Sequence, residues 1–303
     1  MTTLQGPAIP RRRLGAELRR LREDAGFSLD QAATALECST SKISRLETGK
    51  GLPKQRDVRD LLRLYGKTAE QELERLLRWA RDGAREGWWQ EYTKGLGSAE
   101  PFMLDGVDKL VALESDASSI KAFAQPCIFG LLQTPSYARA VLSSALPSHG
   151  PEEIDLLVEL RVRRQKVLSR AEVPVSLHVV FDEGALRRVV GGAEIMIQQF
   201  EHLIAMGRRS NVALQVLPFS AGFTRASAGA FMVISFAESV DQDVVYVESQ
   251  AGSAYLEGDF GVETYARTFD DVSGRALGSL ETEEWLISAE RSFLTGIDDV
   301  GPV

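Results

Sequence analysis

Two short helical patterns meet across a turn within residues 27–53, and this spacing constrains the fold more than any other feature of the chain. Ser28 is a good N-cap for the first helix, in which Ala32 and Ala33 supply small side chains where a second helix must approach closely. After a break in the pattern, Ser39 can cap the second helix. Such a pair is typical of a helix-turn-helix and predicts sequence-specific binding of double-stranded DNA.

The second helix of the pair has the features of a recognition helix. Ile43 and Leu46 would point inward at the i, i+3 spacing, and no large apolar residue obstructs the opposite face. Short hydroxyls and long cations face outward there, and such groups suit phosphate oxygens and base edges in a major groove. The candidate DNA contacts in this segment are Ser39, Thr40, Ser41, Lys42, Ser44 and Arg45.

Positive charge is concentrated at the beginning of the chain. Residues 1–67 carry 14 Lys and Arg against 8 Asp and Glu, a net charge of +6, so the remainder carries −14 of the total of −8. This distribution fits a DNA-binding region confined to one end. Four further cations are predicted to hold phosphates: Arg11, Lys50, Lys54 and Arg56. A small helical bundle with solvated surface charges is the alternative interpretation.

Length and composition predict two domains, and the lack of long apolar stretches predicts a cytoplasmic location. At 303 residues and 44% hydrophobic content, the chain is about twice the size of a typical domain and can bury real cores. No apolar stretch reaches the 18 or more residues that a membrane span needs, and the N-terminus lacks an apolar signal region. We therefore expect a cytoplasmic protein. Cys38 and Cys127 are far apart in the sequence and predict neither a disulfide nor a zinc site.

Beyond residue 67 the pattern alternates helices with apolar strands. A long helix is predicted over residues 68–89 as a connector, and the later part reads as an α+β domain whose sheet is mixed and largely antiparallel. Predicted strands cover residues 175–181, 212–217, 230–236 and 244–248. Predicted helices cover residues 110–123, 151–170, 194–206 and 279–293, with another beginning at Pro135.

The helix predicted over residues 151–170 is unusually basic for the acidic part of the chain. Its cations are Arg161, Arg163, Arg164, Lys166 and Arg170. Internal ion pairs are the favoured interpretation, because runs of charge are usually structural or solvated. A second site for nucleic acid or for an anionic partner is the alternative.

Two sets of residues resemble known families. The first quarter of the chain resembles the XRE-type helix-turn-helix domain, although Leu29 stands where many members carry a glutamine that contacts DNA. The residues that carry this resemblance are Ser28, Ala32, Ala33, Ser39, Ile43, Ser44, Arg45, Glu47 and Gly49.

The remainder of the chain, from about Trp88, resembles the antitoxin-like C-terminal domain of the actinomycete WhiJ-like regulators. Family members usually carry Pro where this chain has Phe129. The resemblance implies a transcriptional regulator, often encoded beside a small acidic protein that acts with it, and implies no catalysis. Its carriers are residues 129–134 (FGLLQT), 137–139 (YAR), 161–165 (RVRRQ), 181–186 (FDEGAL), 191–192 (GG) and 216–222 (VLPFSAG).

The residues themselves give little support to an enzyme. The three histidines, His149, His178 and His202, show no metal-binding spacing. Asp182 and Glu183 are adjacent at a strand end, where successive side chains diverge, so Asp182 is better interpreted as a helix cap. The glycine clusters lack the spacing of a phosphate-binding loop. We expect no catalytic residue, cofactor or metal.

The sequence therefore predicts an all-α helix-turn-helix domain over residues 1–67, a helical connector over 68–100 and an α+β regulatory domain over 101–303. The expected function is that of a DNA-binding transcriptional regulator controlled by a partner protein or ligand. Operator symmetry further predicts a homodimer. The alternative is an antitoxin-like interaction protein that binds a small partner encoded nearby, with DNA binding serving autoregulation.

Overall fold

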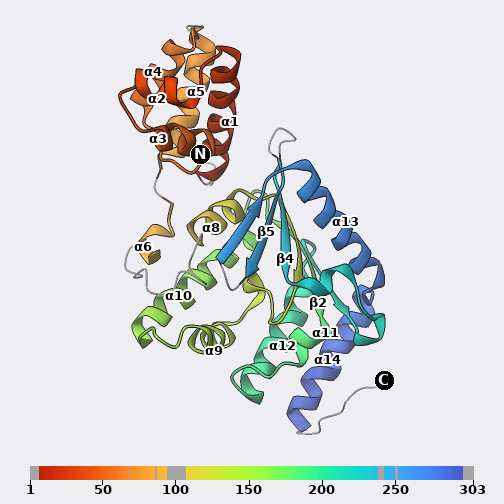
Figure 1. Ribbon diagram of the computed structural model, residues 1–303. Coiled ribbons are helices and arrows are strands. Elements are labelled where there is room, and N and C mark those ends of the chain that lie inside the picture. The colour runs from red at the N-terminus through yellow and green to blue at the C-terminus, as the bar shows by residue number, and fades with distance from the viewer. Residues whose placement is uncertain are drawn as a thin grey trace. The chain divides into compact units, whose positions relative to one another are not determined.

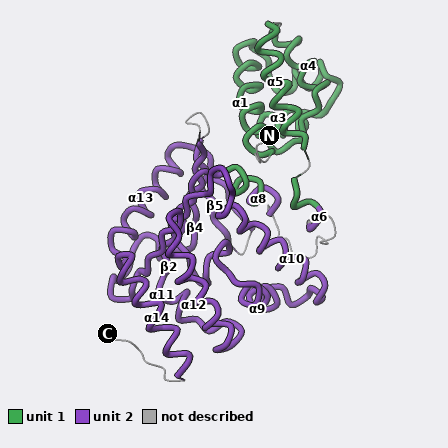
Figure 2. The backbone as a smooth tube through the Cα atoms, turned by 180° about the vertical axis from the view of Figure 1, so that it is seen from behind, with its two compact units in different colours: residues 1–90, 111–116 green, residues 91–110, 117–303 purple. Residues whose placement is uncertain are grey.

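The computed structural model describes residues 7–67, 69–85, 87–93, 107–237, 242–249 and 252–295. The chain forms two compact units (Figure 2). Unit 1 comprises residues 1–90 and 111–116, and unit 2 comprises residues 91–110 and 117–303. No helix among the described residues is long and apolar enough to cross a membrane.

Unit 1 contains a bundle of five helices around one hydrophobic core. Leu18 of the first helix, Ile43 of the third, Leu62 of the fourth and Leu76 of the fifth meet in this core and are almost completely buried. The helices are α1 (Ala8–Asp24), α2 (Leu29–Ala35), α3 (Thr40–Glu47), α4 (Gln55–Leu64) and α5 (Glu70–Gly83).

Helix α5 lies within the segment predicted as a connector over residues 68–100. Leu76, Leu77 and Ala80 on one face of α5 are buried in the same core as α1 to α4, so this helix is part of the bundle. The predicted domain boundary at residue 67 stays a prediction, and Thr68 and residues 94–100 lie outside the described part of the chain.

Unit 2 is built on a six-stranded sheet with the strand order β3-β2-β1-β4-β5-β6 (Figure 1). The β1–β2 and β2–β3 pairs are parallel, whereas the β1–β4, β4–β5 and β5–β6 pairs are antiparallel. The fold class predicted from the sequence, α+β with a mixed sheet, is confirmed. The strands are β1 (Ser119–Ala124), β2 (Ser176–Asp182), β3 (Val212–Leu217), β4 (Phe231–Ser235), β5 (Val244–Ser249) and β6 (Gly252–Leu256).

Helices cover both faces of this sheet. Phe269 and Val272 of α13 pack on Phe123, Phe231 and Val245, which share one face. Helices α9, α10 and α12 lie on the opposite side of the sheet (Figure 1). The helices from residue 90 onward are α6 (Gln90–Thr93), α8 (Val107–Asp116), α9 (Pro135–Ala145), α10 (Pro151–Arg164), α11 (Glu183–Arg187), α12 (Ala193–Gly207), α13 (Asp259–Arg275) and α14 (Ser279–Thr295).

The helix predicted over residues 110–123 is wrong in its second half. Helix α8 ends at Asp116, and the chain then enters β1, a central strand with a parallel neighbour on one side and an antiparallel neighbour on the other. Ala122, Phe123 and Ala124 are all buried, because both faces of a central strand are covered. A strand buried on both faces has no alternating pattern, so its apolar residues fit a helical period as well.

Candidate DNA-binding surface and ligand pocket

Side-chain caps fix both helices of the helix-turn-helix. The Ser28 hydroxyl accepts a hydrogen bond from the Gln31 amide, and the Gln31 side chain accepts one from the Ser28 amide, which completes a capping box on α2. Ser39 caps α3 by accepting from the Lys42 amide at 3.3 Å. Thr40 donates to Asp30 of α2 at 2.7 Å. The predicted N-caps at Ser28 and Ser39 are therefore confirmed.

A buried ion pair holds the end of α3 against α1. Arg22 Nε lies 2.7 Å from Glu47 Oε1, and a second guanidinium nitrogen lies 3.0 Å from Glu47 Oε2. Both side chains are at most 10% exposed. The third guanidinium nitrogen donates to the Phe27 carbonyl, so the fork is fully used, and the hydrogen bond to Glu47 raises the pKa of Arg22. Sequence reasoning missed this pair, because no spacing rule connects residues 22 and 47.

The structure gives the two predicted base-reading cations different surroundings. Lys42 Nζ forms an ion pair with Asp57 Oδ2 of α4 at 2.7 Å, which ties α3 to the following helix. Arg45 is exposed and forms no ion pair within the described part of the chain. Ser41 is also exposed, whereas Ser44 is half-buried. Arg45 is thus the long cation of α3 whose charge is not already neutralised by an acidic neighbour.

The four cations predicted to contact phosphates also differ in their surroundings. Lys50 and Lys54 are exposed in the segment that joins α3 to α4, and Arg56 is 92% exposed, with its Nε 3.8 Å from Asp60. Arg11 differs, because its Nε donates to the Gly83 carbonyl at 2.5 Å. Cations are favourable at the end of a helix, where carbonyl groups lack partners, so Arg11 fastens α1 to the end of α5. Its predicted phosphate contact stays a prediction, beside this structural contact of its Nε.

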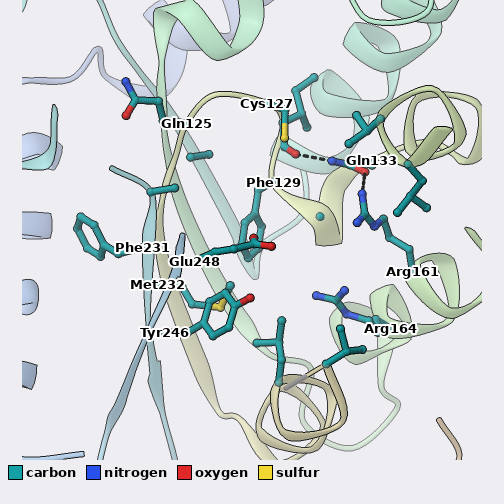
Figure 3. Close-up of a pocket in the computed structure, with 18 of the residues that line it drawn as sticks. Gln125, Cys127, Phe129, Gln133, Arg161, Arg164, Phe231, Met232, Tyr246 and Glu248 are labelled. Atoms are coloured by element: carbon teal, nitrogen blue, oxygen red, sulfur yellow. Dashed lines mark hydrogen bonds between the residues drawn. The ribbon is translucent and has the colours of Figure 1, made fainter. Parts of the chain in front are cut away.

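A pocket of about 180 Å³ lies in unit 2, where the chain leaves β1 and passes through residues 125–134 to α9 (Figure 3). Its apolar walls come from this segment, from α9 and α10 and from strands β4 and β5; Phe129, Met232 and Tyr246 are examples. The polar side chains that line it are Gln125, Cys127, Gln133, Arg161, Arg164 and Glu248.

A network of amides and one phenol holds the pocket segment in place. Gln133 is buried; its Nε2 donates to the Ile128 carbonyl at 2.6 Å, and its Oε1 accepts from Arg161 at 2.7 Å (Figure 3). The Tyr137 hydroxyl accepts from the Ile128 amide, and Gln165 donates to the Gln133 carbonyl at 2.7 Å. The rim is therefore fixed by hydrogen bonds, a typical feature of a preformed binding site.

Sequence motifs that are far apart along the chain meet at this pocket. Residues 129–134, 137–139 and 161–165 carry part of the resemblance described above, and the structure places members of all three in one hydrogen-bonded group. The motifs at residues 181–186 and 216–222 meet elsewhere in unit 2, where the Glu183 carboxylate accepts a hydrogen bond from the Phe219 amide at 2.6 Å. Asp182 caps α11 by accepting from the Gly184 amide, which confirms its predicted role.

The titratable groups of the pocket respond to its low polarity. Glu248 remains partly accessible to solvent, yet desolvation raises the pKa of its carboxyl group, against the opposing effect of Arg161 and Arg164. Burial also raises the pKa of the Cys127 thiol, which disfavours the reactive thiolate at neutral pH. The pocket therefore combines two guanidinium groups and one carboxyl group with apolar walls, a composition suited to binding.

Comparisons with known proteins agree with this division of the chain. The model of a helix-turn-helix domain matches residues 13–79. The model described as a domain of unknown function, DUF5753, matches residues 107–288, which is more than half of the chain and includes every strand of the sheet. No curated protein and no solved structure matches the chain. The helix-turn-helix supports DNA binding in a regulatory role, and by its larger domain the chain belongs to the DUF5753 family.

Proposed function

We propose that this protein is a sequence-specific transcriptional regulator whose C-terminal domain controls its DNA binding in response to a ligand or partner. The observation that carries the proposal is Arg45, which is exposed and has no ion pair with a described residue, on a helix that is capped by Ser39 and anchored by Glu47. Such a helix can enter a major groove without rearrangement, because its orientation is already fixed by the bundle.

In this proposal α3 reads the bases and the segment after it holds the backbone. Arg45 supplies a planar donor fork, which suits the two acceptors of a guanine edge. Lys50, Lys54 and Arg56 contact phosphates on one side of the groove. Lys42 acts through its ion pair with Asp57 by setting the angle between α3 and α4.

The finer features of the proposal come from the resemblances and from operator geometry. We infer an XRE-type, cytoplasmic regulator that binds as a homodimer, since paired half-sites match a two-fold protein. We propose no catalytic role for Cys127, because burial raises the pKa of its thiol and so disfavours a reactive thiolate.

A second candidate is the antitoxin-like interaction protein, in which unit 2 binds a small acidic partner encoded nearby and DNA binding serves autoregulation. The favouring observation is a pair of exposed phenylalanines between β3 and β4. Phe219 is 61% exposed and Phe223 is 86% exposed, and contiguous exposed apolar groups are typical of protein contact sites. A neighbouring open reading frame whose product binds the purified chain would favour this candidate.

The test is a titration of DNA from the protein's own promoter region, followed by fluorescence anisotropy at several salt concentrations. Arg45→Ala should weaken promoter binding by about 1–3 kcal/mol while leaving binding to scrambled DNA almost unchanged, because a base contact distinguishes sequences. Arg78→Ala is the matched control, since Arg78 is an exposed arginine on α5 and does not belong to the α2–α3 pair that forms the helix-turn-helix motif.

Equal weakening on both DNAs would make Arg45 a phosphate contact. Promoter binding that Arg45→Ala and Arg78→Ala leave equally strong would remove α3 from the interface. A wild-type protein that never distinguishes the promoter from scrambled DNA, with or without the neighbouring small protein, would refute the regulator and leave the interaction protein.

A further inference from the structure

We propose that the pocket of unit 2 binds a small organic carboxylate, whose carboxylate group is attached to one ring or to one branched aliphatic group. The regulatory use of such a ligand rests on the proposed function, but the binding itself does not. Three independent features of the pocket carry the inference: its place in the sheet, the charge of its lining and its size.

The pocket lies where the direction of strand addition reverses. From β1 the chain adds β2 and then β3 on one side, and it returns to place β4 on the other side of β1. The end of β1 and the beginning of β4 both contribute to the pocket, through Ala124 and Phe231. In open sheets with parallel strands, such a switch point at the carboxyl ends of the strands is the usual place for a ligand.

The charged lining favours an anion. Helix α10 contributes Arg161 and Arg164, which are three residues apart and therefore project on the same side of the helix. Gln133 holds Arg161 in position, and Figure 3 shows both guanidinium groups directed toward the pocket. Among the described residues of the lining, Glu248 is the acidic one. Two arginines facing one glutamate favour an anionic ligand over a cationic one.

A guanidinium group is the side chain that best matches a carboxylate. Its parallel N–H donors meet the two carboxylate oxygens in a bidentate pair, and such a pair is stronger where water is partly excluded. The buried amide of Gln133 keeps one donor of Arg161 engaged, so the remaining donors of that group are held in a fixed orientation.

The size and the walls of the pocket describe the rest of the ligand. Phe129, Met232 and Tyr246 present aromatic and thioether surfaces, which pack well on rings and branched chains. A cavity of about 150 Å³ is enough for benzene, whereas sites for drug-sized ligands begin at about 300 Å³. At about 180 Å³ the pocket therefore accommodates one ring or one branched group beside the carboxylate.

The experiment is isothermal calorimetry on the full chain with phenylacetate and with 3-methylbutanoate, each compared with its uncharged amide. At least one of the two acids should bind saturably and at least tenfold more tightly than its amide. Arg164→Gln should remove most of this preference, and Arg267→Gln should not, because Arg267 is an exposed arginine on α13.

Gly130→Leu is a second variant that keeps every charge. A Cβ atom on Gly130 would lie 3.9 Å from an Arg164 guanidinium nitrogen, so the backbone tolerates a side chain there while its outer atoms occupy the pocket. We expect at least a tenfold loss of acid binding with an unchanged unfolding temperature. This variant tests the site even if Arg164→Gln fails to fold.

Three results would overturn the assignment: no saturable binding of either acid, equal affinity for acid and amide, or unchanged affinity in the Gly130→Leu variant. The DNA titration described above contains neither of the two acids. A protein that binds promoter DNA but neither acid would therefore refute the pocket alone, and a protein that binds an acid but no DNA would refute the regulator alone.

Discussion

Tyr65 shows how a single buried group affects the stability of unit 1. The side chain is 5% exposed, and its hydroxyl has no hydrogen-bond partner among the described residues. Desolvation by burial, together with the negative charge of Glu47, raises the pKa of Tyr65 to about 12. The folded state therefore holds this proton more tightly than the unfolded chain, whose tyrosines titrate near pH 10.

Tyr65→Phe should leave stability at pH 8 unchanged or raise it by up to about 1 kcal/mol, because the variant removes an unpaired buried hydroxyl. In the wild type, the contribution of a proton held with a raised pKa is complete below about pH 10 and declines toward about pH 12, with a slope of up to about 1.4 kcal/mol per pH unit. The variant should lose less stability over that range. Urea unfolding of the full chain at pH 8 and pH 11, followed by circular dichroism, measures both effects.

Tyr137 provides the matched comparison. Burial raises its pKa to about 12 as well, but its hydroxyl accepts a hydrogen bond from the Ile128 amide. Tyr137→Phe should cost about 1–3 kcal/mol at pH 8, since it leaves a buried donor without a partner. Equal destabilisation by the two substitutions would contradict the assignment of an unpaired hydroxyl to Tyr65.

At the scale of elements, α10 connects the pocket with the segment that follows unit 1 along the chain. Arg161 and Arg164 line the pocket. Arg163 projects from another side of the same helix, donates to the Tyr92 hydroxyl at 3.0 Å and forms an ion pair with Glu91. An internal ion pair, as expected for this basic helix, thus exists at Arg163, and the alternative of an anion-binding site stays a proposal.

We predict that Arg163→Ala separates ligand binding from its effect on DNA. The affinity for the bound acid should stay within about twofold, because Arg163 does not line the pocket. The factor by which the acid changes the promoter affinity should fall toward one. Couplings of about 1–3 kcal/mol need a physical connection between the sites, which this variant removes. Anisotropy titrations of promoter DNA with and without the acid measure this.

Arg139→Ala is the control for that experiment, because Arg139 of α9 forms an ion pair with Asp155 of α10 and does not line the pocket. Removing it tests whether any loss of a contact on α10 has the same effect. If the acid changes promoter affinity equally in the wild type and in Arg163→Ala, α10 is not the connection.

How far an element could be predicted depended on whether its pattern is local. The caps at Ser28 and Ser39 and strand β3 were predictable, because a cap and an alternating pattern occupy a few consecutive residues. Strand β1 was not, since burial on both faces removes the alternation. Helix α13 and strand β6 were not predicted either, because no cap residue and no strong periodic pattern indicates them in the sequence.

The candidate sites follow the same rule. The exposed position of Arg45 was predictable from the pattern of one short helix, whereas its contact with DNA stays a prediction. The ion pair between Lys42 and Asp57 and the contact of Arg11 with Gly83 depend on tertiary packing, which no local pattern encodes. The pocket combines residues from Val107 to Glu248, so its motifs could be recognised in the sequence but their meeting could not be predicted.

At the scale of the whole molecule, charge is divided between a basic beginning and an acidic remainder. A net charge of −14 outside residues 1–67 repels DNA, so nonspecific attraction is confined to the helix-turn-helix part of the chain. The pocket stands out within this acidic part because its lining has more arginine than glutamate. In the proposal above, the small anion therefore meets arginine side chains within a part of the chain whose net charge is negative.

The last prediction follows from the two proposed sites being on one chain. If the acid changes the affinity for promoter DNA by some factor, the DNA must change the affinity for the acid by the same factor, because coupling between two binding sites is reciprocal. We expect a factor of about 5 to 150 in either direction, the usual range for coupled sites. Calorimetry of the acid with and without saturating promoter DNA gives one value, and anisotropy of the DNA with and without saturating acid gives the other.

Scrambled DNA and the Gly130→Leu variant serve as the two controls, since each removes one partner of the coupling. Unequal factors would mean that the two titrations report different species, such as monomer and dimer, and repeating both at several protein concentrations would identify them. A factor of one in both titrations, with both ligands bound, would separate the pocket from regulation: the acid would then bind a protein whose DNA affinity it cannot change.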